Sequence, residues 1–182
     1  MDEKRSFTEG VKEFVKYLVI ASAIALPVRY FVAQPFIVRG ASMEPNFENR
    51  EYLIIDELSY FFREPKRGEV IVFRYPLDPR QFFIKRIVGL PGERVEIKGG
   101  KVLIKKADNT ESVRLEESYI SDSVRTDGTV TLALGRGDYF VLGDNRIQSS
   151  DGRAWGALPR HLMVGRALFR AWPVYKFGIV AN

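Results

Sequence analysis

A change in the hydrophobic period at Gln34-Pro35 is the feature that most constrains the fold of this chain. Beyond it the apolar residues recur with a period near two, in short segments bounded by Gly and Pro, which is the pattern of β-strands. The predicted strands are 36–38, 52–55, 69–75, 81–88, 94–97, 102–104, 139–142 and 163–169. Gly99-Gly100 lies between two of them and indicates a two-residue hairpin turn. We therefore expect a mainly β domain over residues 34–182.

Residues 105–136 differ from the rest of this domain. They are polar, weakly patterned and rich in Ser, Asp and Thr. Such a composition is typical of long loops or of an extended β excursion, and the sequence leaves open which of the two forms.

The only long apolar stretch precedes the β domain. As a helix rising about 1.5 Å per residue, residues 14–33 would cover roughly the 30 Å of a bilayer core. Lys16 and Arg29 interrupt the stretch, but both side chains can extend toward lipid head groups, and Pro27 would kink the helix. We therefore expect one N-terminal transmembrane helix, preceded by a tail over residues 1–13.

Basic residues near the two ends of this stretch predict its orientation. Only Arg39 lies within the first 16 residues after Ala33. The basic residues on the N-terminal side are Lys4, Arg5, Lys12 and Lys16. Because positive charge favours the cytoplasmic side, the tail is expected inside and the β domain outside. Two other interpretations remain open: a cleaved secretory signal, since small-x-small motifs occur in the stretch, and a buried amphipathic helix.

The composition narrows the possible chemistry. Apolar residues make up 46% of the chain, which is enough for a packed core. The absence of cysteine excludes disulfides, thiolate nucleophiles and cysteine-ligated metals. The single histidine, His161, excludes histidine-rich metal sites and is interpreted as a surface or structural residue. The net charge of +5 permits attraction to anionic lipid or to nucleic acid, but no phosphate-binding loop motif occurs.

Ser42 and Lys85 are the candidate catalytic pair. A serine hydroxyl needs a base, and without cysteine or a well-placed histidine the remaining candidate is a lysine. At an ordinary pKa of about 10.4, only about one lysine in 2,500 is neutral at pH 7. A catalytic lysine therefore needs a pKa about three units lower, and desolvation is the usual cause.

The strand pattern around Lys85 shows how this lysine could be desolvated. Alternation places Phe83, Lys85 and Ile87 on one face of the strand, so that Lys85 has apolar neighbours on both sides. The same alternation sends Arg86 to the opposite face with Ile84, where Arg86 can pair with an acid without neutralising the base.

Each residue of the pair also has an ordinary interpretation when taken alone. Lys85 could be an edge-strand lysine that blocks aggregation, and Ser42 could be a turn hydroxyl before Pro45. The Ser-x-x-Lys motif of penicillin-recognising enzymes occurs nowhere in the chain, which disfavours that class of serine-lysine enzyme.

Two aromatic clusters, residues 60–62 and 172–175, flank predicted turns or strand ends. Most such clusters are buried, so a core position is the first expectation. The other interpretation is an aromatic surface that rests in a membrane interface, where Trp and Tyr are favoured.

Four ordered blocks resemble the bacterial type I signal peptidases, membrane-anchored serine-lysine endopeptidases that remove signal peptides from exported proteins. They follow the apolar stretch and its exit at residues 34–38. The blocks are Ser42-Met43-Glu44-Pro45, residues 67–73, residues 83–92, and Gly143-Asp144-Asn145-Arg146 with Ser149, Asp151 and Arg153, which leads to Trp155-Gly156 and residues 164–167. The match runs through nearly the whole chain.

The resemblance implies a role for individual residues. Ser42 would be the nucleophile and Lys85 the general base, with Ser149 orienting the lysine amine. Two acid-base pairs would brace the site, and their members are Asp144 with Arg86 and Asp151 with Arg153. The pockets for the substrate would be lined, by position, by Phe36, Val38, Met43, Phe83 and Ile84.

The resemblance also implies a fold, a substrate and a location. The fold would be an antiparallel β-sheet or barrel-like catalytic domain with a variable insertion at about residues 105–136. The substrate would be an extended peptide with small residues at the first and third positions before the cut, bound as an added strand. Partners would be preprotein signal peptides, membrane lipid and, as a further candidate, the secretion translocase, with no nucleic acid, metal or cofactor. The protein would be a single-pass protein of the cytoplasmic (inner) membrane.

A few positions depart from the family pattern. Gly40 stands where many members carry a serine thought to help bind the oxyanion, so that donor would have to be backbone or water. Asn46, Glu93 and Gly152 replace a usual threonine, aspartate and serine, and none of these changes removes a proposed catalytic group.

Two other functions fit parts of the sequence. A serine-lysine self-cleaving regulator, like those of the DNA-damage repressors, would need an N-terminal helix-turn-helix where this chain has an apolar stretch. A membrane-tethered β module could bind a partner or an acidic ligand through its positive charge, but it would have no reason to hold a neutral lysine.

Overall fold

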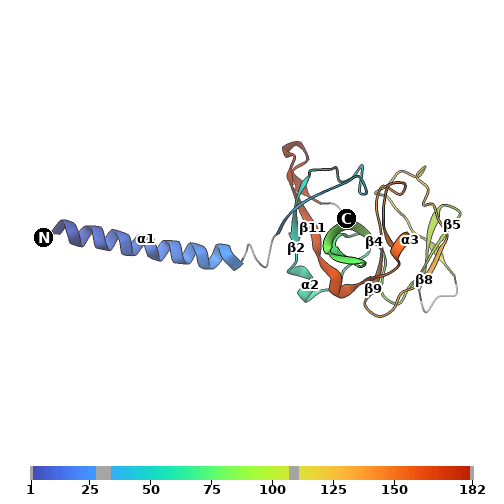
Figure 1. The fold of residues 1–182 in the computed structure, drawn as a ribbon, viewed down its shortest axis with the longest axis horizontal. Coiled ribbons are helices and arrows are strands. Elements are labelled where there is room, and N and C mark those ends of the chain that lie inside the picture. The colour runs from blue at the N-terminus through green and yellow to red at the C-terminus, as the bar shows by residue number, and fades with distance from the viewer. Residues whose placement is uncertain (1, 28–33, 107–110, 181–182) are drawn as a thin grey trace.

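The computed structural model describes residues 2–27, 34–106 and 111–180. A long helix, α1 (Asp2–Pro27), projects away from a β domain that is built from two antiparallel sheets (Figure 1). The expected mainly β, antiparallel class is therefore confirmed.

The larger sheet has eight strands in the order β1-β2-β11-β3-β4-β9-β10, with β12 paired to β11. Its strands are β1 (Gln34–Ile37), β2 (Tyr52–Asp56), β3 (Val70–Tyr75), β4 (Asp78–Gly89), β9 (Asp138–Leu142), β10 (Leu158–Pro159), β11 (Met163–Trp172) and β12 (Gly178–Ile179). β1 and β10 end the path, so within the described residues the sheet is not a continuous hydrogen-bonded ring of the kind that a barrel-like domain implies.

The smaller sheet has the order β7-β6-β5-β8. Its strands are β5 (Arg94–Lys98), β6 (Lys101–Lys105), β7 (Val113–Arg114) and β8 (Val130–Ala133). Val88, Phe140 and Leu142 of the larger sheet pack with Val95 and Ile97 of the smaller one, and all five side chains are buried. The short helices are α2 (Ser59–Phe62), α3 (Gly152–Trp155), η2 (Arg160–Leu162) and η3 (Val174–Lys176).

All eight predicted strands are present, within a few residues of their predicted ends. The predicted hairpin turn is also confirmed, because Gly99 and Gly100 join β5 to β6 with φ angles of 61° and 76° that favour glycine. The strands β7, β8, β10 and β12 are not predicted, since two to four residues are too few to display a period. Residues 105–136 thus combine both expected forms, two short strands joined by loops.

Helix α1 begins at Asp2, well before the predicted apolar stretch, and is described as far as Pro27, so the predicted kink at Pro27 remains a prediction. The rest of that stretch, including Arg29, lies outside the described residues. Between residues 10 and 23 nearly every side chain is exposed, which does not fit the alternative of a helix buried in the core. Among the helices that the structure describes, none combines the length and the apolar character needed to cross a bilayer.

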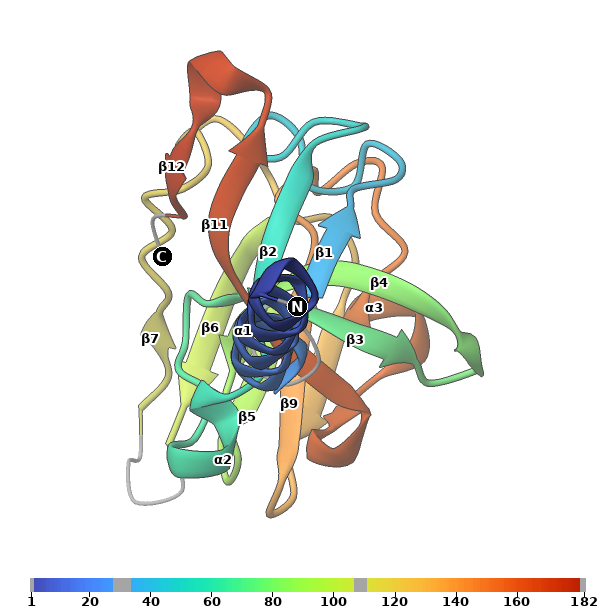
Figure 2. The same ribbon diagram turned by 90° about the vertical axis from the view of Figure 1, so that its left-hand side faces the viewer.

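The aromatic clusters are mostly exposed, so the expectation that they belong to the core is wrong for all but Tyr60. Phe61 and Phe62 of α2 are 77% and 81% exposed, and Trp172 and Tyr175 are 53% and 79% exposed. Both clusters lie at the side of the β domain from which α1 projects (Figures 1 and 2). The cause is local, since a single-turn helix and a hairpin tip have only one side to bury.

Gly165→Ala is predicted to destabilise the β domain. A Cβ at Gly165 in β11 would lie 2.6 Å from the carbonyl oxygen of Asp56 in β2 and 2.8 Å from Ile55 Cγ2. The paired strands would have to separate, at a cost of about 2 kcal/mol, and the thermal unfolding midpoint followed by circular dichroism should fall by about 5 °C.

Gly178→Ala in β12 is the matched control, because no atom lies within 4 Å of its Cβ position. An equal fall of the midpoint in both variants would contradict this explanation.

Candidate active site

Ser42 lies in a turn that follows β1 and is anchored on both sides. Met43 and Phe47, 0% and 2% exposed, fix the turn in the core, and Phe47 N donates to Met43 O at 2.9 Å. From the other side of the site, Asn145 N donates to Ser42 O at 3.1 Å and Asn145 Nδ2 donates to Ala41 O at 3.0 Å. The half-buried Ser42 hydroxyl is thereby held in one place.

Lys85 reaches Ser42 from the middle of β4. Lys85 Nζ lies 2.6 Å from Ser42 Oγ and donates a second hydrogen bond to Ile84 O at 2.9 Å. The Phe83 ring centre lies 5.4 Å from the same nitrogen, in agreement with the predicted shared face. Two residues separated by 43 positions in the sequence are therefore in direct contact.

Burial changes the titration of Lys85. The side chain is only 3% exposed, and desolvation lowers its pKa from 10.5 to about 8, against the opposing charges of Asp151 and Asp144. A lowered pKa is the change that a lysine needs in order to act as a general base. At this pKa about one molecule in ten carries a neutral amine at pH 7.

Arg86 points away from the lysine and pairs with Asp144. Arg86 Nε and Nη2 donate to the two carboxylate oxygens of Asp144 at 2.9 and 2.6 Å. Both side chains are almost completely buried, and Asn46 Nδ2 adds a hydrogen bond to Asp144 at 2.8 Å. The predicted arrangement, a charged pair on the face opposite the base, is present.

The second expected pair, Asp151 with Arg153, lies at the start of α3. Arg153 Nε and Nη2 donate to Asp151 at 2.8 and 2.9 Å, and Gly143 N donates to the same carboxylate at 3.0 Å. Burial alone would raise the pKa of Asp151, but these donors hold it below its usual value. Asp151 is therefore an ionised anchor for the turn that contains Gly143.

Gly143 lets Ser149 approach the Ser42 turn. A Cβ at Gly143 would lie 2.2 Å from Ser149 Oγ and 2.4 Å from Ser42 O, so no larger residue fits without movement. Ser149 Oγ is buried, and its hydroxyl is one of the groups that lower the pKa of Asp151. Its expected role of orienting the Lys85 amine remains a prediction, because no hydrogen bond between the two is present.

A groove of about 800 Å³ opens above Ser42 and Lys85, between β1 and β4. Of the predicted substrate residues, Phe36, Phe83 and Ile84 line it, whereas Val38 and Met43 are buried in the core cluster that contains Ile84 and support the groove from below. Six further residues line the groove without having been predicted, and they are Arg39, Arg80, Gln81, Phe82, Gln148 and Ser150. In the sequence, these residues are marked only by lying a few positions from Ser42, Lys85 or Ser149.

Gly40 also lines the groove, with a φ of 89° that disfavours side chains. Its N–H donates to Asn49 Oδ1 at 3.1 Å. The amide of this residue is thus already engaged in a hydrogen bond.

The insertion contributes contacts that the sequence does not indicate. Arg146, which is buried, pairs with Glu117 of the insertion and donates to Gly143 O at 3.0 Å. The ring of Tyr119, also in the insertion, lies 4.1 Å from Arg86 Cζ. The insertion therefore packs against both the turn beside Ser42 and the charged pair behind Lys85. Among the described residues, no group of three or more His, Cys, Asp or Glu side chains could hold a metal ion.

A sequence profile of the family signal peptidase, peptidase S26, matches residues 11–172. The chain belongs to this family. It is 35% identical to the probable signal peptidase I-1 of Synechocystis sp., over 92% of this chain and 86% of that protein. It is 37% identical to signal peptidase I of Leptolyngbya laminosa, over 91% of this chain and 82% of that protein.

The resemblance to the type I signal peptidases is thereby confirmed, together with the enzyme class, a serine endopeptidase and hydrolase of family S26. A crystal structure of a signal peptidase I from Enterococcus faecalis is 31% identical, covers 57% of this chain and 97% of its own chain, and aligns with a TM-score of 0.47.

Lys85→Met is predicted to stabilise this S26 peptidase at pH 7. The folded-state pKa of about 8 lies below the ordinary 10.5, so below pH 8 the folded state holds an ammonium that would be better solvated in the unfolded chain. The cost is about 3 kcal/mol, offset in part by the two hydrogen bonds of the amine, and it disappears as the pH rises from 8 to 10.5.

Urea unfolding of both proteins at pH 7 and pH 10.5 measures this difference. The exposed Lys98 supplies the control, since Lys98→Met should leave the free energy of unfolding unchanged at both values. A loss of stability in Lys85→Met that is the same at both pH values would contradict the prediction.

Proposed function

We propose that this protein is a membrane-bound serine endopeptidase that removes N-terminal signal peptides from exported preproteins by cutting after small-x-small motifs. The relatives named signal peptidase I support the reaction. The single observation that carries the mechanism is the 2.6 Å contact between Ser42 Oγ and the buried amine of Lys85, inside a groove of an S26 chain.

In the proposed mechanism, neutral Lys85 takes the proton of Ser42 as Oγ attacks the scissile carbonyl carbon. The tetrahedral intermediate then collapses, and the lysine ammonium gives its proton to the leaving amine while the acyl-enzyme remains. Water, deprotonated by Lys85 in turn, hydrolyses the ester and releases Ser42. Ser149 orients the amine, and the pairs of Asp144 with Arg86 and Asp151 with Arg153 hold the surrounding turns. No cofactor enters any step.

Two free strand edges support an extended peptide as the substrate. In the described part of the chain, β1 pairs with β2 on one side only, and β4 pairs with β9 only from Arg86 onward. The edges of β1 and of the first part of β4 both border the groove. A peptide can therefore add to the sheet by main-chain hydrogen bonds, with small residues facing Phe36, Phe83 and Ile84 next to Ser42.

The proposed location is the cytoplasmic membrane, with residues 1–13 inside, an anchor over residues 14–33, and residues 34–182 outside. The large apolar side chains between residues 11 and 20 of α1 are all exposed. The exposed aromatic residues of α2 and of the hairpin formed by β11 and β12 lie on the same side of the β domain (Figure 1). Exposed aromatic residues on the same side as a helix that exposes apolar side chains fit a lipid interface. Lipid and the secretion translocase are the proposed partners besides the preprotein.

Ser42→Ala and Lys85→Met are expected to reduce the cleavage of a preprotein by at least about a thousandfold, because each removes one half of the nucleophile-base unit. In the unmodified enzyme kcat/KM should rise about tenfold per pH unit up to pH 8 and then level off, since the neutral amine is the active form and burial lowers the pKa of Lys85 to about 8.

Lys98→Met is the control for the loss of a lysine, and it should retain both the rate and the pH profile. Cleavage by Ser42→Ala at the rate of the unmodified enzyme would refute the mechanism, and so would a pH profile that is flat between 6 and 8.

Trp172 is predicted to lie at the lipid surface when the full-length chain is reconstituted into vesicles. A Trp155→Phe variant leaves Trp172 as the only tryptophan, and lipids brominated on the acyl chain should quench its fluorescence because the ring would reach the interface. In the control, Trp155→Phe, Trp172→Phe and Lys98→Trp together move the only tryptophan to β5, on the side of the domain away from α1 (Figure 1). Equal quenching of the two reporters, or none of Trp172, would contradict the proposed orientation.

A further inference from the structure

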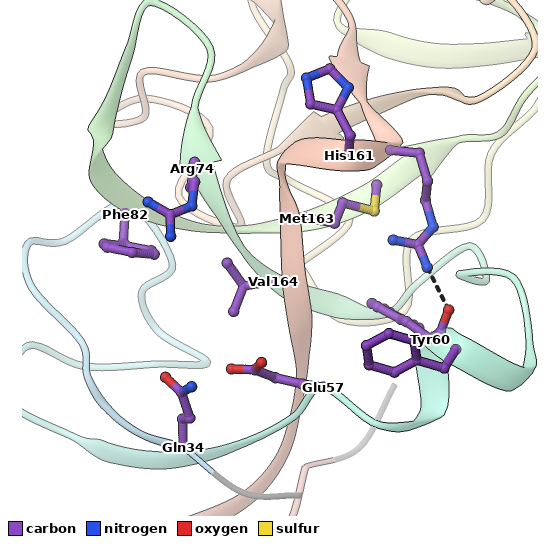
Figure 3. A pocket seen from close by; sticks show the side chains of 10 residues that line it. Gln34, Glu57, Tyr60, Arg74, Phe82, His161, Met163 and Val164 are labelled. Carbon is purple, nitrogen blue, oxygen red and sulfur yellow. Dashed lines mark hydrogen bonds between the residues drawn. The ribbon is translucent and has the colours of Figure 1, made fainter. Parts of the chain in front are cut away.

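A second cavity, of about 380 Å³, lies next to the substrate groove (Figure 3). It lies among the start of β1, the end of β2, helix α2, β3, β4 and β11. The residues that matter for its chemistry are Gln34, Glu57, Arg74, Phe82, Met163 and Val164. The proposed mechanism does not use this cavity.

Glu57 is the unusual residue of the cavity. Its Oε1 atom is buried and has no hydrogen-bond partner among the described residues, and burial raises the pKa of the carboxyl. The neighbouring Asp56, by contrast, accepts hydrogen bonds from Ser59 and Arg166. A carboxylate oxygen that is out of water without a partner is costly, so the position is suited to a donor that arrives with a ligand.

The cavity continues the substrate groove. Phe82 lines both, and Gln34 is followed by Pro35, which lines the groove. β1 leads toward Ser42 and β4 leads toward Lys85, so the cavity lies at the end of the groove away from the catalytic pair. An extended peptide bound along these strands would reach the cavity with a residue about four to seven positions from the scissile bond.

The lining of the cavity favours a long basic side chain. Figure 3 shows the Glu57 carboxylate pointing into the cavity between Gln34 and Val164. Val164, Met163 and Phe82 offer apolar contact for an aliphatic stem, and the carboxylate receives the cation at its end.

The basic side chains of the lining have other partners or lie open to solvent. Arg74 Nη1 donates to Pro79 O at 3.3 Å, and its guanidinium lies 4.9 Å from the ring centre of Phe82. Arg160 Nη2 donates to Tyr60 O at 2.8 Å, the bond drawn in Figure 3. His161 is exposed. None of these three forms an ion pair with Glu57 in the described part of the chain.

We propose that this cavity is an extended substrate subsite, in which Glu57 receives a lysine or arginine side chain located about four to seven residues before the cut. The inference rests on the proposed function. In that proposal the substrate residues before the cut lie along Phe36, Phe83 and Ile84, and this placement sets the direction in which the peptide runs. The subsite would make the enzyme select substrates by charge as well as by the small side chains next to the cut.

The test uses four peptide series, each with lysine, alanine or glutamate at one position from the fourth to the seventh before the cut. The full-length enzyme is expected to prefer lysine over glutamate in kcat/KM by about five- to tenfold at one of these positions. In Glu57→Gln the ratio should fall to about one, and in Glu57→Lys it should invert. Each ratio is measured within one variant, so a difference in the folded fraction between variants cancels.

Glu111→Gln is the matched control, an exposed carboxyl between β6 and β7 that should retain the preference of the unmodified enzyme. A flat ratio at all four positions, or the same ratio in Glu57→Gln as in the unmodified enzyme, would overturn the subsite.

The peptide with alanine at all four positions separates this failure from a failure of the proposed function. If the unmodified enzyme cleaves it and Ser42→Ala does not, the peptidase assignment holds whatever the ratios are. If neither cleaves it, the proposed function fails and the subsite fails with it.

Discussion

The structure of the site depends on keeping one lysine amine out of water while two carboxylates lie nearby. Asp144 and Asp151 both favour the charged form of Lys85 and oppose the effect of desolvation. Each is held by an arginine, Arg86 or Arg153, through two hydrogen bonds. The ion pairs therefore affect Lys85 indirectly: they balance the charge of the acids that shape the turns, and desolvation is the largest influence on the pKa of Lys85.

The Ser42 turn is held by contacts between segments that are far apart in the sequence. Asn145 fixes the Ser42 turn, Asp151 fixes Gly143, and Arg146 joins this turn to Glu117 in the insertion. Close approach is possible only because Gly143 has no side chain. A hydroxyl and an amine at hydrogen-bond distance require this degree of support, since a small displacement would separate them and lose the activation of the nucleophile.

The groove shows how a β domain can use free strand edges. Unpaired edges favour aggregation in most proteins, and here the edges of β1 and of the first part of β4 border a groove that Ser42 and Lys85 also line. Pro35 in β1 and the exposed Arg80 in β4 discourage pairing with another sheet. The same edges remain available to a single extended peptide, which is the geometry that the proposed function needs.

Local patterns in the sequence determined the eight main strands, the Gly99-Gly100 turn and the opposite faces of Lys85 and Arg86, because alternation and turn conformation depend on neighbouring residues alone. They also identified Ser42 and Lys85 as candidates through their resemblance to a family. Only the tertiary structure decided the contact between the two residues, the lowered pKa of the lysine, the exposure of the aromatic clusters and the burial of Glu57 Oε1 without a hydrogen-bond partner among the described residues. Each of these properties depends on which distant segments of the chain pack around a side chain and exclude water from it. Local sequence patterns do not indicate that packing.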